Sequence, residues 1–558
     1  MPYGWSTHDF TDDDLQLVPV WVCDTVHWPV PMTPLYATSL LPQPSWYWFN
    51  AAAQYFSEPR SKGWEHRLRN GYMYISLIPV PKDEIPAREK KFRERMAPVM
   101  DDPWGFINKE KAKLTSTIER VWPADLEHMD DFELWRYVYI DKMDLVHASE
   151  QYHFMVMRGL SSAFALFRQL CAELFGIRPH EITFAKLMSG YDNSIFQVNK
   201  AIAELATRAV ALKVDDSLRL PDREVLSAME QSEAGREWLS ALRSFIQIHG
   251  LRQIGALWDY NSLTWFEDPS LAMPDIKRAL AAGGIHAPEL HRERLVRERE
   301  ETERDILSKT PLEQREWFEK LMRCAQAAQF FSEDHSYHVE YKSACIGRLA
   351  FMEVARRLVR AGRMDDPDDI FYLTWEELLA GIKQRPPIRD WLRSHKEEWN
   401  YNNSLGPPGA TEQVPPFIGD MSALGEIAAS DSIFSVVAAP PIATPEEIGA
   451  TVVGAAGAPG VAEGIARVIL SEAEFDKVQP GDILVSPQTN STWTPLFGII
   501  KGAVTDAGGT MAHAAIVGRE YGIPAVVGTI DGTRKIKTGD RIKVDGSLSA
   551  VYVLERAK

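Results

Sequence analysis

The chain has 558 residues, of which 78 are acidic and 61 basic, so its formal net charge is −17 at pH 7. This length permits several domains and a large core, and the acidic balance argues against nucleic acid or an anionic membrane as a partner. No run approaches the roughly 18 apolar residues that span a bilayer. The start lacks a basic and apolar leader, and the four cysteines lack CxxC spacing. We therefore expect a cytoplasmic protein with reduced thiols.

The first part of the chain, residues 1–404, has a predominantly helical pattern that is rich in aromatic side chains. Long periodic stretches such as 298–331 and 342–362 predict amphipathic helices. Residues 70–80 differ and predict an extended segment after a turn. We interpret residues 1–404 as one mainly helical α+β domain.

A change of composition divides the rest of the chain. Residues 405–449 are rich in Pro, Gly and Ala without a sustained hydrophobic period, which predicts a linker that can pivot. Residues 450–558 alternate short β-like runs with glycines and one helical segment, which predicts a small α/β domain. Trp493 is the single tryptophan after Asn403, and His513 is the single histidine after His395.

The histidine of this small domain lies where a helix is expected to begin. In GGTMAHAAIVGREYG, Thr510 is a suitable N-cap, Met511 to Tyr521 would form the helix, and His513 falls in its first turn. The free N–H groups and the positive dipole there favour an anion attached to the ring. A neutral imidazole is also a nucleophile toward phosphorus. The alternative is a chemically idle histidine packed against the sheet.

The whole segment decides between these two interpretations. It resembles the phosphohistidine swivelling domain of the phosphoenolpyruvate-utilising enzymes, over about 105 residues that include 454–470, 481–497 and a closing hairpin at 536–554. The resemblance implies that His513 is the phosphoryl carrier and that Thr505, Gly508, Gly509 and Thr510 hold the phosphate. Ala512 is a departure, because many members have Ser or Thr directly before the histidine.

Residues 1–404 resemble the substrate domain of phenylphosphate synthase and of rifampicin phosphotransferase, on stretches such as LMSGYDNSIFQVNKAIAEL and HGLRQIGALWDYNSLTWFEDPS. This implies dikinase-type transfer to a phenol in aromatic degradation: ATP, a phenol and water give an aryl phosphate, AMP and inorganic phosphate. These 558 residues contain neither an ATP-grasp signature nor a Walker motif. We therefore expect ATP and Mg²⁺ to be bound by a separate ATP-grasp subunit.

A phenol must lose a proton as it attacks, so the acceptor site needs a base and positive charge. His335, His338 and Lys342 share one helical face at spacings of three and four and could supply both. A solvated polar face is the alternative, and the HxxH pair lacks a nearby third ligand for a metal. We predict no metal site in this chain.

Two further groups are candidates for the acceptor site. Arg252 keeps the place of the arginine in the GHR sequence of the relatives, Leu251 replaces its histidine, and His249 lies close enough to substitute. Trp46 and Trp48 could line a phenol pocket or simply pack in the core. Glu267 and Asp268 are interpreted as turn residues.

Two functions other than the enzyme stay open at this point. One is a phosphorelay or regulatory protein in which His513 passes phosphate to another protein. The other is a binding protein that has lost the activity, which Ala512 favours. A closed apolar acceptor pocket would indicate the enzyme, and an exposed docking surface would indicate the relay.

Overall fold

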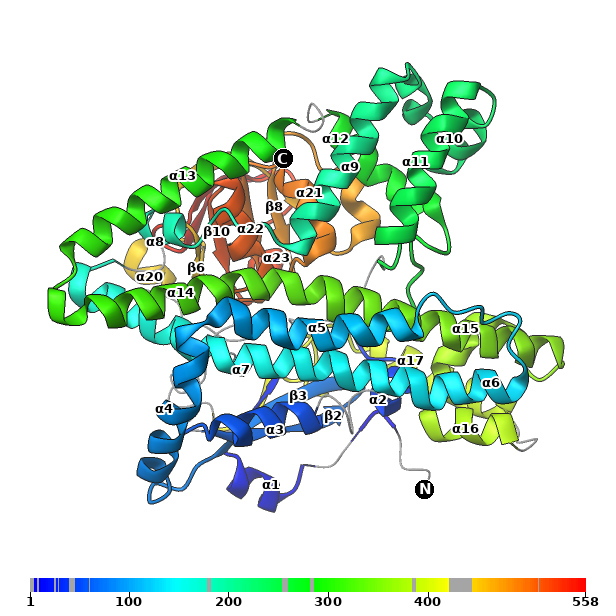
Figure 1. Ribbon diagram of the computed structural model, residues 1–558, viewed down its shortest axis with the longest axis horizontal. Coiled ribbons are helices and arrows are strands. Elements are labelled where there is room, and N and C mark those ends of the chain that lie inside the picture. The colour runs from blue at the N-terminus through cyan, green and yellow to red at the C-terminus, as the bar shows by residue number, and fades with distance from the viewer. Residues whose placement is uncertain are drawn as a thin grey trace. The chain divides into compact units, whose positions relative to one another are not determined.

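A computed structural model describes most of the chain, which divides into two compact units. The first unit contains residues 1–162, 256–262 and 338–431, and the second contains residues 163–255, 263–337 and 432–558. Figure 1 labels many of the elements by which each unit is described below. The described residues are 5–7, 10–24, 27–28, 30–39, 46–59, 61–177, 182–252, 259–281, 286–383, 388–420, 444–509 and 511–557.

A four-stranded sheet with the order β2-β3-β1-β4 forms the β part of the first unit. Its antiparallel hairpin turns at Asn70 and Gly71, whose φ angles of 53° and 76° give the left-handed conformation that a tight hairpin needs. The extended segment predicted for residues 70–80 is therefore confirmed. The strands are β1 Val20–Cys23, β2 Ser61–Arg69, β3 Tyr72–Pro79 and β4 Phe417–Gly419.

Strand β4 lies inside the stretch predicted to be a linker. It pairs antiparallel with β1, and the nearby Val414 is fully buried in the core of this sheet. Pro415 and Pro416 directly precede β4, and a three-residue edge strand is the kind of strand that tolerates prolines. Residues 405–420 thus belong to the first unit, while residues 421–443 lie outside the described part of the chain. The domain boundary itself stays a prediction.

Helices make up the rest of the first unit, and capping explains where several begin. Asp102 accepts a hydrogen bond from the backbone of Gly105 at the start of α5, and Asp130 forms a capping box with Glu133 in α6. The α-helices are α1 Asp12–Leu17, α2 Pro34–Ser39, α3 Trp46–Phe56, α4 Ile85–Asp101, α5 Pro103–Val121, α6 Asp131–Arg136, α15 Ala344–Arg360, α16 Trp375–Lys383 and α17 Ile388–Ser404. Short elements are the π-helix η2 Tyr137–Asp141 and the 3-10 helix η6 Pro367–Tyr372.

Two helical elements continue from one unit into the other: α7 Lys142–Phe175 and the π-helix η5 Ser336–Ser343. The remaining helices of the second unit that precede its sheet follow from strong apolar stripes, such as the buried face of α11. They are α8 Ile182–Leu187, α9 Ser194–Ala211, η3 Asp215–Arg219, α10 Asp222–Met229, α11 Glu233–His249, η4 Pro269–Ala272, α12 Met273–Ala281, α13 His286–Lys309 and α14 Leu312–His335.

An eight-stranded sheet forms the carboxyl-terminal part of the second unit, with the order β5-β12-β11-β7-β8-β9-β10-β6. Four neighbouring strands, β7 to β10, are parallel, and apolar clusters cover both faces. The predicted β-runs and closing hairpin are confirmed by β5 Val452–Val453, β6 Ala455–Ala458, β7 Val461–Val468, β8 Ile483–Ser486, β9 Gly502–Thr505, β10 Ala525–Val527, β11 Arg541–Asp545 and β12 Ala550–Glu555.

The helical segments around this sheet are short, and α22 is the longest of them. It packs against β6, β9 and β10 and places its first residue at the edge where parallel strands end. These segments are α20 Pro445–Ile448, η8 Glu472–Lys477, η9 Ser491–Trp493, α21 Thr494–Phe497, α22 His513–Tyr521 and α23 Gly532–Lys535. The predicted class, a mainly helical part followed by a small α/β part, is confirmed.

Among the described helices, none combines the length and apolar character needed to cross a bilayer. All four cysteines are free and buried.

Candidate active site

His513 is the first residue of α22, so it lies at the amino-terminal end of that helix. The prediction that the helix starts at Met511 is wrong by two residues, because Ala512 is the N-cap residue, with extended backbone angles of φ −70° and ψ 154°. Alanine offers no side-chain oxygen to cap the first N–H groups. Thr510, predicted to be the N-cap, lies outside the described residues.

Two threonine hydroxyls contact the two nitrogens of the His513 ring. Thr489 Oγ1 lies 2.9 Å from Nδ1, and Thr494 Oγ1 lies 3.0 Å from Nε2. Both belong to the segment that follows β8, while His513 follows β9. Because β8 and β9 are parallel neighbours, the segments after them meet at one edge of the sheet, where ligands of open α/β sheets bind. Sequence reasoning missed both threonines, although the hydroxyl-rich run QTNSTWT was a signal.

Burial and a nearby charge keep the imidazole neutral. The His513 side chain is 9 % exposed, and the ring of Phe497 packs edge-on against it at 5.7 Å. Burial and, secondarily, the positive charge of Arg252 lower the pKa of His513 to about 3. Glu333 Oε2 lies 4.0 Å from Nε2, but with a neutral ring this contact is not an ion pair at neutral pH. A neutral nitrogen with an available lone pair is what nucleophilic attack on phosphorus requires.

Helix α14 supplies the side chains that face α22. Arg519 donates one hydrogen bond to the Gly457 carbonyl at 2.7 Å and another to Gln329 Oε1 at 3.2 Å. Its charge and that of Glu333 attract each other, and the pKa of Arg519, lowered to about 10 by burial, leaves it positive at pH 7. Arg519 of α22 therefore partly balances the negative charge of Glu333 near His513.

A second contact joins the far end of α22 to the helices of the same unit. Both carboxylate oxygens of Glu520 accept from the backbone N–H of Gly190, at 3.1 and 3.0 Å. Burial raises the pKa of Glu520 to about 7, against the lowering effect of this hydrogen bond and of Arg299. Glu520 thus titrates near neutrality.

Arg252 and His249 both lie in the second unit, which also contains His513, whereas the sequence placed them in a separate acceptor domain. Arg252 is almost fully buried, with its guanidinium 4.7 Å above the ring of Trp265, and its charge acts on His513. His249 ends α11, and its Nδ1 lies 3.0 Å from the hydroxyl of Tyr337. The positive charge of Arg252 also opposes the burial that raises the pKa of Tyr337. The charge of Arg252 therefore acts both on His513 and on Tyr337, which contacts His249.

The residues predicted to hold phosphate have other visible roles. Thr505 ends β9 and donates its hydroxyl to the Ala507 carbonyl at 2.8 Å. Gly508 has φ +114°, and a Cβ there would lie only 2.8 Å from the Cβ of Ala512. The backbone turn therefore explains Gly508, and the Gly509 carbonyl accepts the N–H of Ala512 at 3.0 Å. Thr489 and Thr494 place hydroxyl groups next to the His513 ring, whereas Ala512 has no hydroxyl.

His335, His338 and Lys342 do not share the α-helical spacing assumed for them. His335 ends α14, whereas His338 and Lys342 lie in the π-helix η5, which has more residues per turn. His335 belongs to the second unit, stacks on Phe331 at 5.0 Å and contacts the Phe331 carbonyl through Nδ1 at 2.9 Å. His338 belongs to the first unit and is buried, which does not fit the alternative of a solvated face. Burial lowers the pKa of Lys342.

The remaining candidates are placed as follows. Trp48 is half-buried on α3 of the first unit and donates its indole N–H to His147 at 3.2 Å, whereas the side chain of Trp46 lies outside the described part. Glu267 accepts hydrogen bonds from Thr264, and Asp268 caps η4, as expected of turn residues. In the described part of the chain, no three His, Cys, Asp or Glu side chains are grouped to hold a metal.

Two family models match this chain, and they cover the two sides of the His513 site. Residues 478–548 match the mobile domain of the PEP-utilising enzymes, and residues 151–333 match the fourth domain of rifampicin phosphotransferase. The chain therefore carries a PEP-utilising enzyme mobile domain. The threonines and His513 lie in the first match, and Arg252 and Glu333 lie in the second.

The chain is also similar to individual proteins over parts of their length. The chain is 28 % identical to chondramide synthase cmdD of Chondromyces crocatus over 96 % of its own length. It is 29 % identical to the rifampicin phosphotransferase of Streptomyces sviceus over 60 %, and 46 % identical to a probable phosphoenolpyruvate synthase of Pyrococcus horikoshii over 19 %. It spans only 14 %, 36 % and 13 % of these three proteins, respectively.

Proposed function

We propose that this chain is a phosphotransferase subunit in which His513 takes a phosphoryl group from an ATP-binding partner subunit and delivers it to a hydroxyl group. The observation that carries this proposal is a neutral imidazole at the start of a helix, with a threonine hydroxyl on each ring nitrogen. The match to a PEP-utilising mobile domain supports the carrier role.

The first transfer forms a bond between phosphorus and a ring nitrogen. If Nδ1–H donates to Thr489, the lone pair stays on Nε2, the nitrogen that faces Glu333. Attack by Nε2 on the β-phosphorus of ATP breaks its bond to the AMP oxygen, and water removes the γ-phosphoryl group as inorganic phosphate, which leaves phosphohistidine and AMP. The N–H groups and dipole at the start of α22 then favour the negative charge of the phosphoryl group.

The second transfer breaks the N–P bond and forms an O–P bond to the acceptor, whose proton passes to a base. We propose a phenol as the acceptor, so that ATP, the phenol and water give an aryl phosphate, AMP and inorganic phosphate. Arg252 would balance the charge of the moving phosphoryl group, because its positive charge already acts on the His513 ring. Aromatic degradation is the corresponding role.

ATP and magnesium belong in this proposal to the partner subunit. Among the described residues no three His, Cys, Asp or Glu side chains are grouped to hold a metal, and we derive no step through the ion. Division of the reaction over two sites would let each site exclude water separately.

The experiment mixes the chain with an ATP-grasp partner, ATP labelled in its β-phosphate and a panel of phenols. Acid-labile label on the chain and phenol-dependent AMP release are expected, and His513→Ala should lose both while keeping the circular dichroism spectrum. Label that persists in His513→Ala would overturn the carrier role. Label that moves to a protein but never to a phenol would instead establish the relay.

A further inference from the structure

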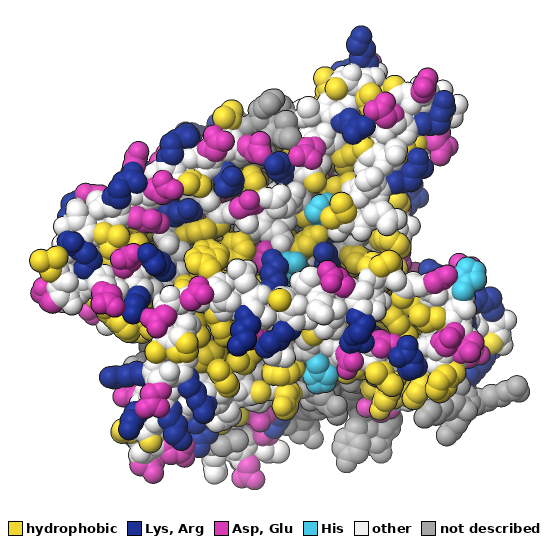
Figure 2. All heavy atoms as spheres, viewed as in Figure 1, with side chains coloured by type: hydrophobic (Ala, Val, Ile, Leu, Met, Phe, Trp, Pro, Cys, Tyr) yellow, Lys and Arg dark blue, Asp and Glu magenta, His cyan; other side chains and the backbone are white. Residues whose placement is uncertain are grey.

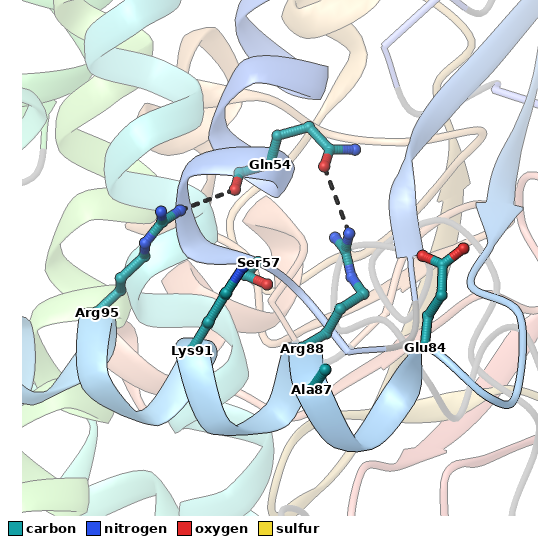
Figure 3. A pocket seen from close by; sticks show the side chains of 7 residues that line it. All are labelled: Gln54, Ser57, Glu84, Ala87, Arg88, Lys91 and Arg95. Carbon is teal, nitrogen blue, oxygen red and sulfur yellow. Dashed lines mark hydrogen bonds between the residues drawn. The ribbon is translucent and has the colours of Figure 1, made fainter.

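A cleft in the first unit lies between the end of α3 and the first turns of α4, away in sequence from every residue of the His513 site. Its volume is about 320 Å³. Figure 3 shows Arg88, Lys91 and Arg95 rising from α4 toward Gln54 and Ser57 at the end of α3. None of these residues has a role in the proposed phosphoryl transfer.

Positive charge is concentrated in this cleft, although the chain carries a net charge of −17. Arg88, Lys91 and Arg95 follow one another at spacings of three and four, which places them on one face of α4. Figure 2 shows Lys and Arg side chains over this helix, with Asp and Glu side chains among them. Glu84 is the acidic residue of the lining, and its carboxylate is paired with Lys62 at 2.9 Å. The cleft therefore has an excess of cations.

The contacts of Arg88 leave one of its donors without an acceptor. Its Nε donates to the Glu58 carbonyl at 2.5 Å, and its Nη1 reaches Gln54 Oε1 at 3.4 Å. Its Nη2 atom is buried and has no hydrogen-bond partner among the described residues. A buried donor is rarely left unpaired, and a small rotation of the Arg88 side chain toward the cleft would let an acceptor of the ligand pair with it.

The other walls of the cleft also favour an anion. The guanidinium of Arg95 is held by the Gln54 carbonyl at 3.0 Å, so it is oriented before any ligand arrives. Ser57, which ends the wall formed by α3, has φ +56°, the left-handed angle with which helices commonly end. Two guanidinium groups and a flexible ammonium are the donor set that binds phosphate.

We propose that this cleft binds a small phosphate monoester, with its phosphate against Arg88, Lys91 and Arg95. The volume lies at the lower end of ligand pockets, which suits a phosphate with one small ring and excludes a nucleic-acid strand. The site is independent of His513, so it remains whether or not the proposed phosphoryl transfer is correct. The ligand would be an aryl phosphate product or another phosphorylated metabolite of this size.

The test is a calorimetric titration of the full chain with phenyl phosphate, with inorganic phosphate and with phenol, at low and at moderate salt. We expect saturable binding of phenyl phosphate at one site, weakened by salt, and no comparable binding of phenol. If inorganic phosphate binds as well as phenyl phosphate, the result would support the site and would show that it recognises the phosphate group alone. The His513→Ala variant should bind unchanged, which separates this cleft from the site at α22.

Lys91→Gln is the decisive variant, because Lys91 is exposed and its loss should leave the fold intact. Lys91→Gln and Arg88→Gln should each weaken binding by roughly tenfold, the expected loss of one charge-assisted contact. The matched control is Lys90→Gln, an exposed neighbour on α4 that does not line the cleft. Absence of saturable binding, or equal weakening by Lys90→Gln and Lys91→Gln, would overturn the proposal.

Discussion

Thr489 Oγ1 lies 2.9 Å from Nδ1 of His513, so a hydroxyl from the segment after β8 orients the imidazole that follows β9. A neutral imidazole has one donor and one acceptor nitrogen, and a threonine hydroxyl can pair with either, so we expect the tautomer in which Nδ1–H donates to Thr489. The lone pair is then kept on Nε2, beside Thr494.

We predict that Thr489→Val slows phosphorylation of His513 by roughly tenfold, the loss expected for one hydrogen bond of about 1.4 kcal/mol. Thr489→Ser, which restores the hydroxyl, should recover most of the rate. Nitrogen NMR of the histidine ring should show the Nδ1–H tautomer in the natural protein and a mixture in Thr489→Val. An unchanged rate and tautomer in Thr489→Val would contradict this role.

Glu333 is the carboxylate next to Nε2, and we predict that it takes the proton of the acceptor hydroxyl. A phosphoryl group on Nε2 would extend toward this carboxylate, which lies 4.0 Å from the nitrogen. Glu333→Gln should leave the labelling of His513 near its normal rate and slow discharge to a phenol by roughly 100-fold, the usual contribution of a general base. Single-turnover discharge of the isolated phosphoprotein measures this step alone.

The control for Glu333 is Glu316→Gln, a strongly exposed glutamate on the same helix. His338→Ala provides a comparison, because the sequence predicted His338 as the base. If discharge slows in His338→Ala and not in Glu333→Gln, the base is His338, and Glu333 only balances Arg519.

Glu520 predicts a pH-dependent contact between α22 and Gly190. Its folded pKa is raised to about 7, so the buried carboxyl holds a proton that an exposed glutamate would release above pH 4.5. The favourable contribution of Glu520 to the free energy of unfolding is therefore fully present below pH 4.5, and it is lost as pH rises through 7. Hydrogen exchange at the Gly190 amide, corrected for its intrinsic pH dependence, should become faster between pH 5 and 8.

Glu520→Gln gives the matched comparison, since a glutamine oxygen can accept from Gly190 but does not titrate. The corrected exchange rate of Gly190 should then be independent of pH over the same range. A pH dependence equal to that of the natural protein would assign the effect to another group.

Short-range sequence patterns predicted the parts of this site that are formed by residues close together in the chain. The β-like runs of the last hundred residues predicted the strands, and the segment GGTMAHAAIVGREYG predicted a helix with His513 in its first turn. Thr489 and Glu333 could not be found in this way, because they reach His513 from 24 residues and from 180 residues earlier in the chain. Periodicity also failed at His338, since the π-helix η5 changes the spacing on which a common face depends.

Lys142 gives a prediction about stability, because this amine is fully buried among aromatic rings. Its Nζ lies 4.7 Å from the ring centroid of Phe351, 5.2 Å from that of Tyr260 and 5.5 Å from that of Trp375. No hydrogen-bond partner for Nζ exists among the described residues, and burial lowers the pKa of Lys142 to about 7. Folding at neutral pH therefore removes a proton that the unfolded chain retains up to pH 10.5.

A lowered folded pKa means that the unfolded state binds more protons between pH 7 and 10.5, so the free energy of unfolding should rise with pH in that window. Lys142→Met keeps the apolar stem without the amine, and it should stabilise the protein at pH 7 by roughly 2–4 kcal/mol. The gain should shrink as pH rises toward 9.5, below the range in which tyrosines ionise. Urea unfolding of both proteins at several pH values measures the difference, and a constant or negative gain would show that the three rings stabilise a charged Lys142.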